Sequence, residues 1–306
     1  MPDHRFELPS ASDGQIPVVH CWQAEAPERG AVILVHGMGE HSLRYASLAE
    51  SLTAAGFKVY ANDHRGHGET VKDDSQLGDY GPDGWRGLID DQLRLIHKVR
   101  EDNAGPVLII GHSMGSMIVQ HLLTEASGLL DGAALSGTTA VDVMAAAVAA
   151  NVNAGEADLF ASFNAAFEPV RTQSDWLSRD PEQVDLYVND PLCGFSVSDA
   201  SLRSLMEAGV VFSTKEMTER IRKDLPIYLF AGDADPVSLG GELVKRVAER
   251  YRAAGIVDVT LKLYPGARHE VFNETNRAEV AADFIAWATQ VRDAWANDCA
   301  GRGVSQ

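Results

Sequence analysis

The segment Gly111-His112-Ser113-Met114-Gly115 places a serine between two glycines, after the apolar run 107–110 and before a helix-like stretch that begins at residue 116. In a sharp strand-to-helix turn, the serine hydroxyl is lifted above the sheet, where it can attack a carbonyl carbon. Such a turn is strained, so the positions two residues before and after the serine need almost no side chain. The pentapeptide is common in isolation, but its place between a buried strand and a helix favours catalysis. We therefore expect Ser113 to be a nucleophile.

A serine hydroxyl is a poor nucleophile near neutral pH, so it needs a base and a carboxylate that orients that base. On a sheet with a serine elbow, these groups follow the chain order serine, acid, histidine. His121 would lie two turns into the helix after the elbow, too far from the reacting carbonyl. His269 instead follows the last predicted strand, in a loop at its carboxyl end. The position of His269 predicts the base.

The acid should come from the segment Gly232-Asp233-Ala234-Asp235-Pro236, which follows the predicted strand 227–231. Both aspartates stand at the carboxyl end of a strand and just before a predicted helix. Either could be the orienting acid, and one of them could instead cap the helix, since aspartate is a favoured N-cap residue. Position along the chain leaves the choice between Asp233 and Asp235 open.

Negative charge on the reacting oxygen needs backbone amide donors. Met114 follows the serine directly, so its amide is aimed at that oxygen. A second amide should come from Met38, where Gly37 and Gly39 let the backbone approach a substrate. Each such donor is typically worth on the order of 10²–10³ in rate. We expect the Met38 and Met114 amides to form an oxyanion hole.

The elements that must position these residues alternate between short apolar strands and longer helices. Near the start of the chain, residues 5–8 and 15–23 on either side of the Asp13-Gly14 turn predict an antiparallel edge hairpin. Further strands are predicted at residues 31–36, 57–61, 107–110, 132–136, 227–231 and 259–264. Helices are predicted at residues 42–55, 85–101, 116–127, 237–254 and 276–296. Nearly continuous apolar strands alternating with helices predict an α/β fold with a doubly wound, mostly parallel sheet. Its ligand crevice should lie at the carboxyl ends of the strands.

The alternation stops between about residues 138 and 222, where the sequence predicts several helices and no clear strand. A structureless loop of that length would be unusual in a compact domain. We therefore expect residues 138–222 to form a helical cap, or lid, over the crevice. Residues 1–137 and 223–306 are expected to form the core.

Composition narrows the classes of partner. The 306 residues carry a formal net charge of −18, which argues against nucleic acid and anionic membrane surfaces as partners. No apolar run approaches the roughly 18 residues that span a bilayer, so stable membrane insertion is not expected. Three scattered cysteines and an amino terminus without signal-peptide character predict a cytoplasmic protein. The sequence leaves the oligomeric state open.

Two histidine pairs, His36 with His41 and His64 with His67, raise the question of a metal site. Neither pair has a cysteine or carboxylate at a recognised ligand spacing, so we expect no metal. No cofactor is expected either, because a serine, a histidine and an aspartate suffice for acyl transfer. Asp63 is expected to brace the loops around the elbow, as is Arg65.

Several motifs occur in one order along the chain, and together they cover residues 28–137 and 223–290. They are His36-Gly37-Met38-Gly39-Glu40-His41-Ser42 with Arg44-Tyr45, Asp63-His64-Arg65-Gly66-His67-Gly68, Gly111-His112-Ser113-Met114-Gly115, Gly232-Asp233-Ala234-Asp235 and Tyr264-Pro265-Gly266-Ala267-Arg268-His269. This set resembles the monoacylglycerol lipase and lysophospholipase-like branch of the α/β-hydrolases. The resemblance implies that the second polar position of the acid loop, Asp235, is the triad acid. It also implies a serine hydrolase that cleaves carboxylic esters through an acyl-enzyme.

The predicted cap resembles that family less. Acidic residues are interspersed in it, where lipases of the family carry a more lipophilic rim: Glu156, Asp158, Asp175, Asp185 and Asp190. This favours a monoacylglycerol, a lysophospholipid or a short-to-medium acyl ester over a membrane-docking lipase's substrate. The same triad could serve a thioesterase, an amidase or peptidase, or a cofactor-free haloperoxidase. A non-catalytic protein that binds a ligand in the crevice is a further alternative.

Overall fold

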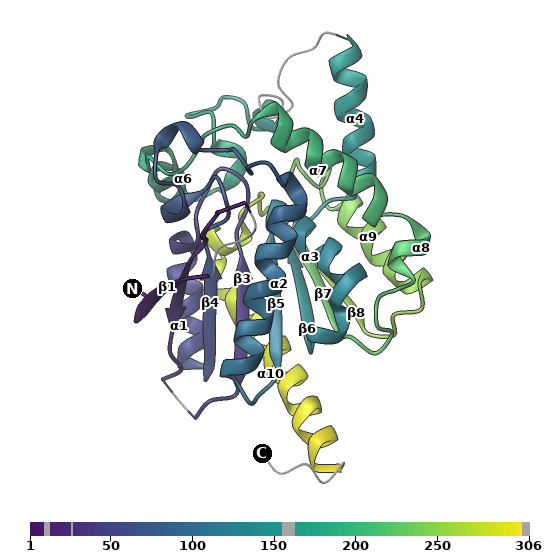
Figure 1. Cartoon of the computed structure of the whole chain (residues 1–306). Helices are drawn as coiled ribbons and strands as arrows, with labels where there is room; N and C mark the ends of the chain where they lie inside the picture. The colour runs from purple at the N-terminus through teal and green to yellow at the C-terminus, as the bar shows by residue number, and fades with distance from the viewer. Residues whose placement is uncertain (9–12, 26, 155–162, 302–306) are drawn as a thin grey trace.

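An eight-stranded sheet forms the centre of the molecule, which a computed structural model describes over residues 1–8, 13–25, 27–154 and 163–301 (Figure 1). The strands lie in the order β1-β2-β4-β3-β5-β6-β7-β8. They are β1 His4–Glu7, β2 Val18–Trp22, β3 Gly30–Val35, β4 Phe57–Asn62, β5 Val107–His112, β6 Gly132–Ser136, β7 Ile227–Gly232 and β8 Val259–Tyr264. Neighbours from β4 to β8 pair in parallel, whereas β1 and β2 form an antiparallel hairpin that joins β4. The predicted doubly wound, mostly parallel sheet with an edge hairpin is confirmed.

The sheet winds outward in two directions from its centre. β3 connects to β4 on one side, and β5 connects to β6 on the other, although β3 and β5 are neighbours. In their parallel pairing, Val35 lies opposite Gly111, so the loops that leave these two strands start side by side. A crevice opens at such a switch point. The fold therefore brings the glycine-containing loop after β3 next to Ser113.

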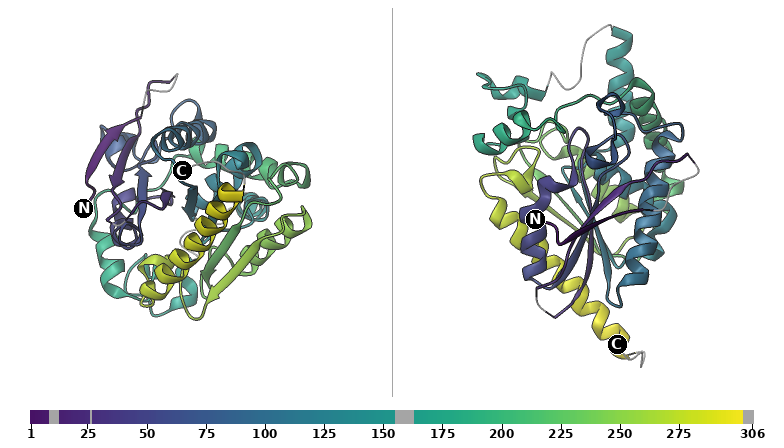
Figure 2. Two further views of the ribbon diagram at one scale, coloured as in Figure 1. Left: turned by 90° about the horizontal axis from the view of Figure 1, so that it is seen from below. Right: turned by 60° about the vertical axis from the view of Figure 1, so that its left-hand side comes forward.

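Helices cover both faces of the sheet and bury two separate apolar layers. On one face, α1 Ala46–Ala54 and α10 Arg277–Gly301 pack over a cluster that includes Leu48 and Phe284. On the other face lie α2 Gly84–Asp102, α3 Met114–Ala126 and α9 Glu242–Ala253, whose buried residues include Leu88, Ile118 and Val244. Figure 2 shows the sheet between these two layers. Burial on both faces explains why most of the strands are almost entirely apolar.

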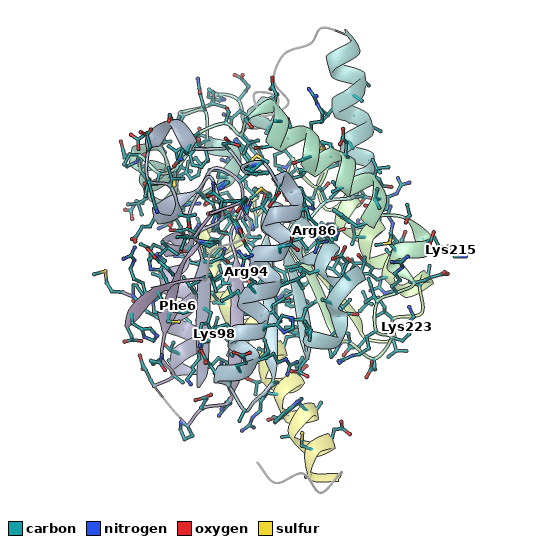
Figure 3. All side chains as sticks on the ribbon, viewed as in Figure 1. Phe6, Arg86, Arg94, Lys98, Lys215 and Lys223 are labelled. Carbon is teal, nitrogen blue, oxygen red and sulfur yellow. The ribbon has the colours of Figure 1, made fainter. Side chains whose placement is uncertain are left out.

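The amphipathic pattern of α2 shows how the sequence orients a helix. Leu88, Ile96 and Val99 are fully buried at helical spacing. Arg86 and Lys98 lie on the opposite, outward face (Figure 3), each paired with an acidic residue four positions along the helix. Such exposed pairs contribute little stability, so the apolar stripe is what holds α2 to the sheet.

Among the differences from the sequence-based prediction are two helix boundaries and the burial of one strand. α9 begins at Glu242 instead of 237, because Leu239, Gly240 and Gly241 all have positive φ and cannot continue a helix. α10 extends to Gly301, five residues past its predicted end. β8 is not covered on both faces: it is the edge strand, and most of its residues are only half-buried.

Between β6 and β7 the described residues form helices and turns above the carboxyl ends of the strands. They include α4 Val141–Ala154, α6 Pro181–Asn189, α7 Asp199–Phe212 and the short α8 Lys215–Thr218. α7 packs against α4, α2 and α3, and α4 projects away from the body of the molecule (Figure 1). Asp180 and Ser198 cap α6 and α7 by accepting hydrogen bonds from backbone amides in the first turn of each helix. Helices without a strand were predicted for this region.

None of the helices in the described ranges combines the length and the apolar character that a membrane crossing requires.

Candidate active site

Ser113 occupies a sharp turn between β5 and α3, and its backbone is strained. Its φ of 51° and ψ of −121° lie outside the regions that non-glycine residues ordinarily adopt. A Cβ atom added to Gly111 would overlap the carbonyl group of Gly115, and one added to Gly115 would overlap the carbonyl group of Val35. The two glycines are therefore required by close backbone packing on either side of the serine. Strain of this kind is retained where a reactive group must be held in place.

Asp235 and His269 meet at the carboxyl end of β7. Nδ1 of His269 lies 2.9 Å from Oδ1 of Asp235, and the imidazole N–H donates to the carboxylate. The same carboxylate oxygen accepts the Val237 amide at 2.9 Å, and Asp235 is fully buried. Asp233 is exposed and accepts the amide of Gly266 at 2.6 Å. The structure thus brings Asp235, and not Asp233, to the predicted base.

The surroundings of His269 favour its protonated form. Burial opposes the positive charge, but the charge and hydrogen bond of Asp235, with help from Glu270 and Glu40, raise the pKa of His269 above its ordinary value. The neighbouring ring of His112 lies 4.8 Å away between centroids. Burial and the proximity of His269 lower the pKa of His112 to about 3, so it stays neutral at physiological pH. An imidazole held in this way can accept a proton and carry the charge while a reaction proceeds.

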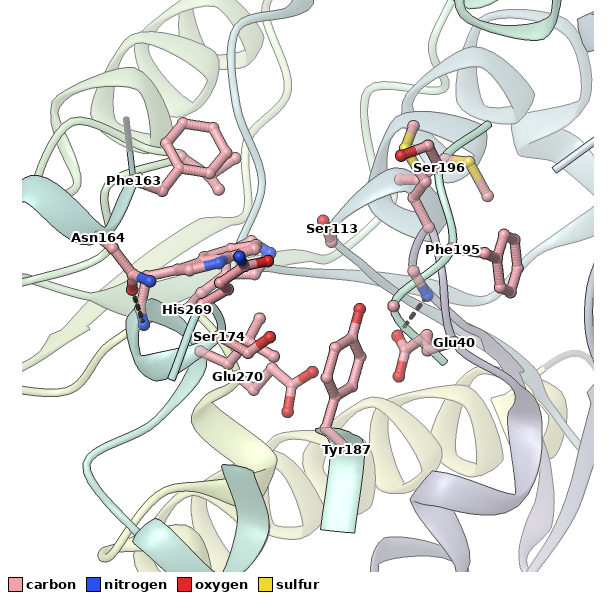
Figure 4. Close-up of a pocket in the computed structure, with 18 of the residues that line it drawn as sticks. Glu40, Ser113, Phe163, Asn164, Ser174, Tyr187, Phe195, Ser196, His269 and Glu270 are labelled. Carbon is pink, nitrogen blue, oxygen red and sulfur yellow. Dashed lines mark hydrogen bonds between the residues drawn. The ribbon is translucent and has the colours of Figure 1, made fainter. Parts of the chain in front are cut away.

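Ser113 and His269 line one cavity, as Figure 4 shows, with Glu270, Tyr187 and Glu40 also on its walls. Within the described residues, no hydrogen bond joins the Ser113 hydroxyl to the His269 ring. Catalytic hydrogen bonds are often long or poorly aligned before substrate binds, and a hydroxyl turns freely about its Cα–Cβ bond. The acid–base pair is therefore assembled, and the serine lines the same cavity as the base.

The loop after β3 lies against the serine. A Cβ atom on Gly37 would come within 3.2 Å of the Ser113 Cβ, so the backbone that leads to Met38 passes next to the nucleophile. Met114 is the first residue of α3, where a backbone amide has no acceptor within the helix. Met38 and Met114 both line the cavity. This is the placement that the oxyanion-hole prediction requires for two amides.

A buried network of charges, which the sequence reasoning missed, joins this loop to the histidine loop. The Arg44 guanidinium makes two hydrogen bonds to the Glu270 carboxylate, at 2.6 and 2.7 Å, and a third to Glu40 at 2.7 Å. Glu40 in turn accepts the Gly37 amide at 2.6 Å (Figure 4) and the hydroxyl of Tyr45 at 2.7 Å. The Arg44 guanidinium thus connects Glu270, which follows the base in the chain, to Glu40 in the loop after β3. Glu270 stands next to His269 in the chain, which was the available signal.

Two carboxylates that share one guanidinium titrate differently. Burial disfavours the charge on Glu270, but its paired hydrogen bonds to Arg44 lower its pKa to about 2. Burial, together with the neighbouring charge of Glu270, raises the pKa of Glu40, although Arg44 offsets part of that rise. Glu270 is therefore the firmly ionised partner of Arg44.

Asp63 was predicted to brace the loops around the elbow, and its hydrogen bonds agree with that prediction. Its carboxylate accepts the Ser42 amide at 2.9 Å, the Ser42 hydroxyl at 2.6 Å and the Glu69 amide at 2.7 Å. Arg65, also predicted to brace a loop, is buried and bonded to Asp91 and Asp13. Both residues lie outside the set that lines the cavity.

The histidines that raised the question of a metal have other partners. Nε2 of His36 accepts the His64 amide, Nε2 of His64 donates to the His36 carbonyl, and Nε2 of His67 accepts the Gly39 amide. These rings brace the loop after β3. Among the described residues, one group has donor atoms close enough to hold a metal ion, all within 4.8 Å of one another: His41, Asp190 and Cys193. His41 and Asp190 are hydrogen-bonded at 2.9 Å, and the positive charge of Arg44 is near Cys193. A contact between the loop after β3 and the region between β6 and β7 accounts for this group.

The cavity measures about 1050 Å³ and has an apolar side and a polar side. Its apolar wall comes mainly from α3, α4 and α7: Met117, Met144, Val148, Leu202, Leu205 and Met206. Polar residues line other parts of it, including Asn164, Thr172, Gln173, Ser174, Tyr187 and Ser196. Cavities of this size and mixed character suit small molecules with an apolar part and a few hydrogen-bonding groups.

Three of the acidic residues of the predicted cap have partners within the protein. Asp175 is buried and accepts the amides of Arg171 and Thr172. Asp185 pairs with Arg171 at 2.5 Å, and Asp190 pairs with His41. Glu156 and Asp158 lie outside the described residues. These three aspartates therefore serve contacts within the protein, and they are weak evidence about substrate polarity.

Comparison with known proteins places the chain among ester hydrolases. Residues 26–276 match the family model described as serine aminopeptidase, S33. A monoacylglycerol lipase from Mycolicibacterium smegmatis is 32% identical over 92% of this chain and 96% of its own length. The human monoglyceride lipase is 28% identical, over 86% of this chain and 82% of its own. Among solved structures, a thermostable carboxyl esterase from Bacillus coagulans in complex with glycerol superimposes with a TM-score of 0.83. It is 30% identical and covers 95% of this chain and 99% of its own.

Proposed function

The chain belongs to the serine aminopeptidase S33 family of α/β-hydrolases, and from that premise we propose that it hydrolyses acyl esters of glycerol at Ser113 through an acyl-enzyme. It is a carboxylic ester hydrolase, as its relatives are. The observation that carries the assignment of residues is the strained Ser113, which lines the same cavity as His269, the buried hydrogen-bond partner of Asp235.

In the first half of the proposed reaction, Ser113 Oγ attacks the ester carbonyl carbon while Nε2 of His269 removes its proton. Asp235 holds the imidazole in the tautomer that exposes Nε2 and stabilises the imidazolium that forms. The Met38 and Met114 amides donate to the oxygen that becomes negative. The C–O bond then breaks, and His269 gives its proton to the departing alcohol.

In the second half, a water molecule takes the place of the alcohol. His269 removes a proton from this water as its oxygen attacks the acyl carbon. The bond between the acyl carbon and Ser113 Oγ then breaks, and His269 returns the proton to that oxygen. The products are a carboxylic acid, an alcohol and the free enzyme. Every proton in this cycle passes through one imidazole, so no metal or cofactor is needed for it.

The cavity and the relatives support an acylglycerol as the substrate. The methionine and leucine wall suits an acyl chain, and the polar wall suits a glycerol moiety. Two relatives are named for monoacylglycerols, and a similar solved structure holds glycerol. Lysophospholipids and other short-to-medium acyl esters have the same reacting bond. We also propose that residues 138–222 act as the cap, over a core of residues 1–137 and 223–306, because α4, α6 and α7 contribute to the cavity.

Peptidase activity, which the family description raises, is less well supported. A carboxylate without another cation partner would suit the ammonium group of a peptide substrate. The two buried carboxylates among the described lining residues, Glu40 and Glu270, are both bonded to Arg44. Thioester, peptide and haloperoxidase substrates belong in the same assay as comparisons.

We also propose a cytoplasmic location, supported by three free cysteines: Cys21, Cys193 and Cys299. Cell fractionation with an antibody to the chain tests it, and recovery outside the cytoplasmic fraction would overturn it.

Hydrolysis of 1-monoacylglycerols by the Ser113→Ala variant tests the proposed function. The variant should keep its circular dichroism spectrum and lose turnover by at least about 10³-fold. A folded variant that still hydrolyses the ester at the native rate would refute the role of Ser113. Native protein that folds but cleaves none of a panel of acyl esters would refute the function itself.

A further inference from the structure

The ring of Trp176 packs against the imidazole of His269. Their centroids are 5.1 Å apart and their planes are inclined by 36°. Trp176 is half-buried and also lines the cavity, so one indole lies at the boundary between the histidine and the substrate space. A residue that only lined the pocket would not need this contact with the base.

Hydrogen bonds hold the backbone of Trp176 against the histidine loop. The Trp176 carbonyl accepts the His269 amide at 3.4 Å, and the next carbonyl, that of Leu177, accepts the Glu270 amide at 2.8 Å. On the other side, the Trp176 amide donates to Oδ1 of Asn164 at 2.9 Å. The Phe163 ring lies 5.0 Å from the indole, and Figure 4 shows Phe163 and Asn164 beside His269.

Buried polar contacts continue this attachment on the carboxyl side of Trp176. Glu274 has no exposed surface, and its carboxylate pairs with Nε of Arg179 at 2.8 Å. It also accepts the Arg179 amide at 3.0 Å and the Arg268 amide at 2.8 Å. The Ser178 hydroxyl donates to the Asn273 carbonyl at 2.9 Å. Residues 176–179 and 268–274 therefore form one unit, and the backbone of Trp176 cannot move away from the histidine loop without breaking several hydrogen bonds.

Because the indole lies against the imidazole, it can stabilise a positive charge on that ring. An aromatic face within about 6 Å of a cation attracts it, and tryptophan does so most strongly. His269 is neutral before it takes the serine proton and positively charged afterwards. An interaction that strengthens as the charge develops lowers the barrier, because it stabilises the transition state more than the ground state.

We propose that Trp176 is a positioning residue for the base, whose indole face orients the His269 ring and stabilises its imidazolium form. The inference rests on the proposed function, in which His269 is the base. It goes beyond that function by giving one cap residue a part in the acid–base step as well as in shaping the cavity.

Steady-state hydrolysis of a soluble p-nitrophenyl ester by Trp176→Leu and Trp176→Phe, measured from pH 5 to 9, tests this proposal. Leucine keeps an apolar side chain beside the imidazole but has no ring, whereas phenylalanine keeps a ring.

The acidic limb of kcat/KM reports the pKa of the base in the free enzyme. Loss of a cation–π contact should lower the proton affinity of His269 about two- to thirtyfold. For Trp176→Leu the limb should therefore move to lower pH by about 0.3 to 1.5 units, and kcat should fall. Trp176→Phe should retain most of the native limb.

The other titratable groups that face His269 are unchanged in these variants: Asp235 after β7, His112 on β5, Glu270 in the same loop and Glu40 in the loop after β3. Phe195→Leu is the matched control. Phe195 also lines the cavity, but its ring packs on His67, at 5.0 Å. This control should alter KM and leave the acidic limb in place.

Three results would overturn the proposal. They are an unshifted limb in Trp176→Leu, equal shifts in the leucine and phenylalanine variants, or a shift of the same size in Phe195→Leu. Labelling of Ser113 by a fluorophosphonate separates these results from failure of the proposed function. Native protein that labels normally, beside a Trp176→Leu variant with an unshifted limb, removes only the role of Trp176. Native protein that neither labels nor turns over removes the function as well. Thermal unfolding of each variant identifies any that fails to fold. If Trp176→Leu fails, Trp176→Met, which also lacks a ring, takes its place with the same expected shift and the same overturning result.

Discussion

At the scale of single residues, the site separates two aspartates that look alike in the sequence. Asp233 and Asp235 are two positions apart in one loop, yet one holds the turn at Gly266 and the other holds the base. The sequence could not choose between them by position, and the family resemblance favoured Asp235. The reason is geometric: the backbone turns at Asp233 and Ala234, where the Asp235 amide donates to the Gly232 carbonyl, so that Asp233 stays exposed and Asp235 is buried.

Replacement of these two aspartates by asparagine should therefore have unequal effects. Asp235→Asn keeps the shape of the side chain but removes the charge that stabilises the imidazolium, so kcat should fall by about 10³–10⁴-fold. Asp233→Asn is the matched control and should stay within about tenfold of native, because Asp233 has no contact with His269. Steady-state kinetics on one soluble ester compares them. Equal losses in the two variants would contradict the assignment of the acid.

The pH dependence of the native enzyme follows from the pKa of His269. A base acts only when it is neutral, and the pKa of this imidazole is raised, mainly because Asp235 outweighs the effect of burial. Below that pKa the ring is protonated, so kcat/KM should fall as the pH drops. The midpoint of the fall should lie above 6.5, the ordinary value for histidine. A profile that stays flat down to pH 5 would exclude His269 as the base.

The strained backbone at Ser113 should lower the stability of the fold. A positive φ is strained for serine and easily adopted by glycine. We therefore expect Ser113→Gly to be more stable than Ser113→Ala by about 1 kcal/mol, although both variants lack the nucleophile. Urea unfolding monitored by fluorescence measures the difference. A glycine variant less stable than the alanine variant would show that the turn is not strained.

At the scale of elements, the loops after β3 and β8 depend on one guanidinium. Arg44 reaches Glu40 in the first loop and Glu270 in the second, a contact between residues 226 positions apart. No local pattern predicts such a pairing, because nothing near Glu270 in the sequence identifies its partner. The strands, by contrast, were predicted to within two residues at every end except the start of β2, which lies three residues later than predicted, since most strands are apolar runs between turns. Periodicity shows where an element lies, and long-range contacts decide how its loops are held.

Arg44→Met should destabilise the fold as well as the site. It leaves two buried carboxylates without their shared cation, a change that typically costs about 3–5 kcal/mol. Arg86→Met is the control, because Arg86 lies on the surface of α2 and its ion pairs contribute at most about 1 kcal/mol. Urea unfolding at neutral pH gives both values. A loss below 1 kcal/mol for Arg44→Met would mean that the network does not hold the loops.

α7 should set the length of acyl chain that the cavity accepts. Met206 lines the apolar wall, and a tryptophan in its place would fill space that a longer chain needs. Met206→Trp should lower kcat/KM for p-nitrophenyl decanoate at least tenfold relative to the butyrate ester. An unchanged ratio of the two rates would place the acyl chain elsewhere in the cavity.

At the scale of the whole molecule, the switch between β3 and β5 brings distant parts of the chain together. The amide-bearing loop, the nucleophile, the acid and the base follow four different strands, β3, β5, β7 and β8, and the sheet order places all four at the carboxyl ends of the strands. This much was predictable, because parallel strands end at the same edge and each candidate residue followed a predicted strand. The contacts of the region between β6 and β7 were not predictable. Its acidic residues looked like a polar rim, but Asp175, Asp185 and Asp190 bond to other parts of the protein.

The account depends most on the identity of the nucleophile. Incubation of the native chain with a fluorophosphonate, followed by peptide mass spectrometry, locates the residue that forms the covalent adduct. We predict a single adduct on the peptide that contains Ser113, formed in parallel with the loss of esterase activity. Activity that persists after complete modification of Ser113, or an adduct on a different residue that accompanies inactivation, would contradict the account.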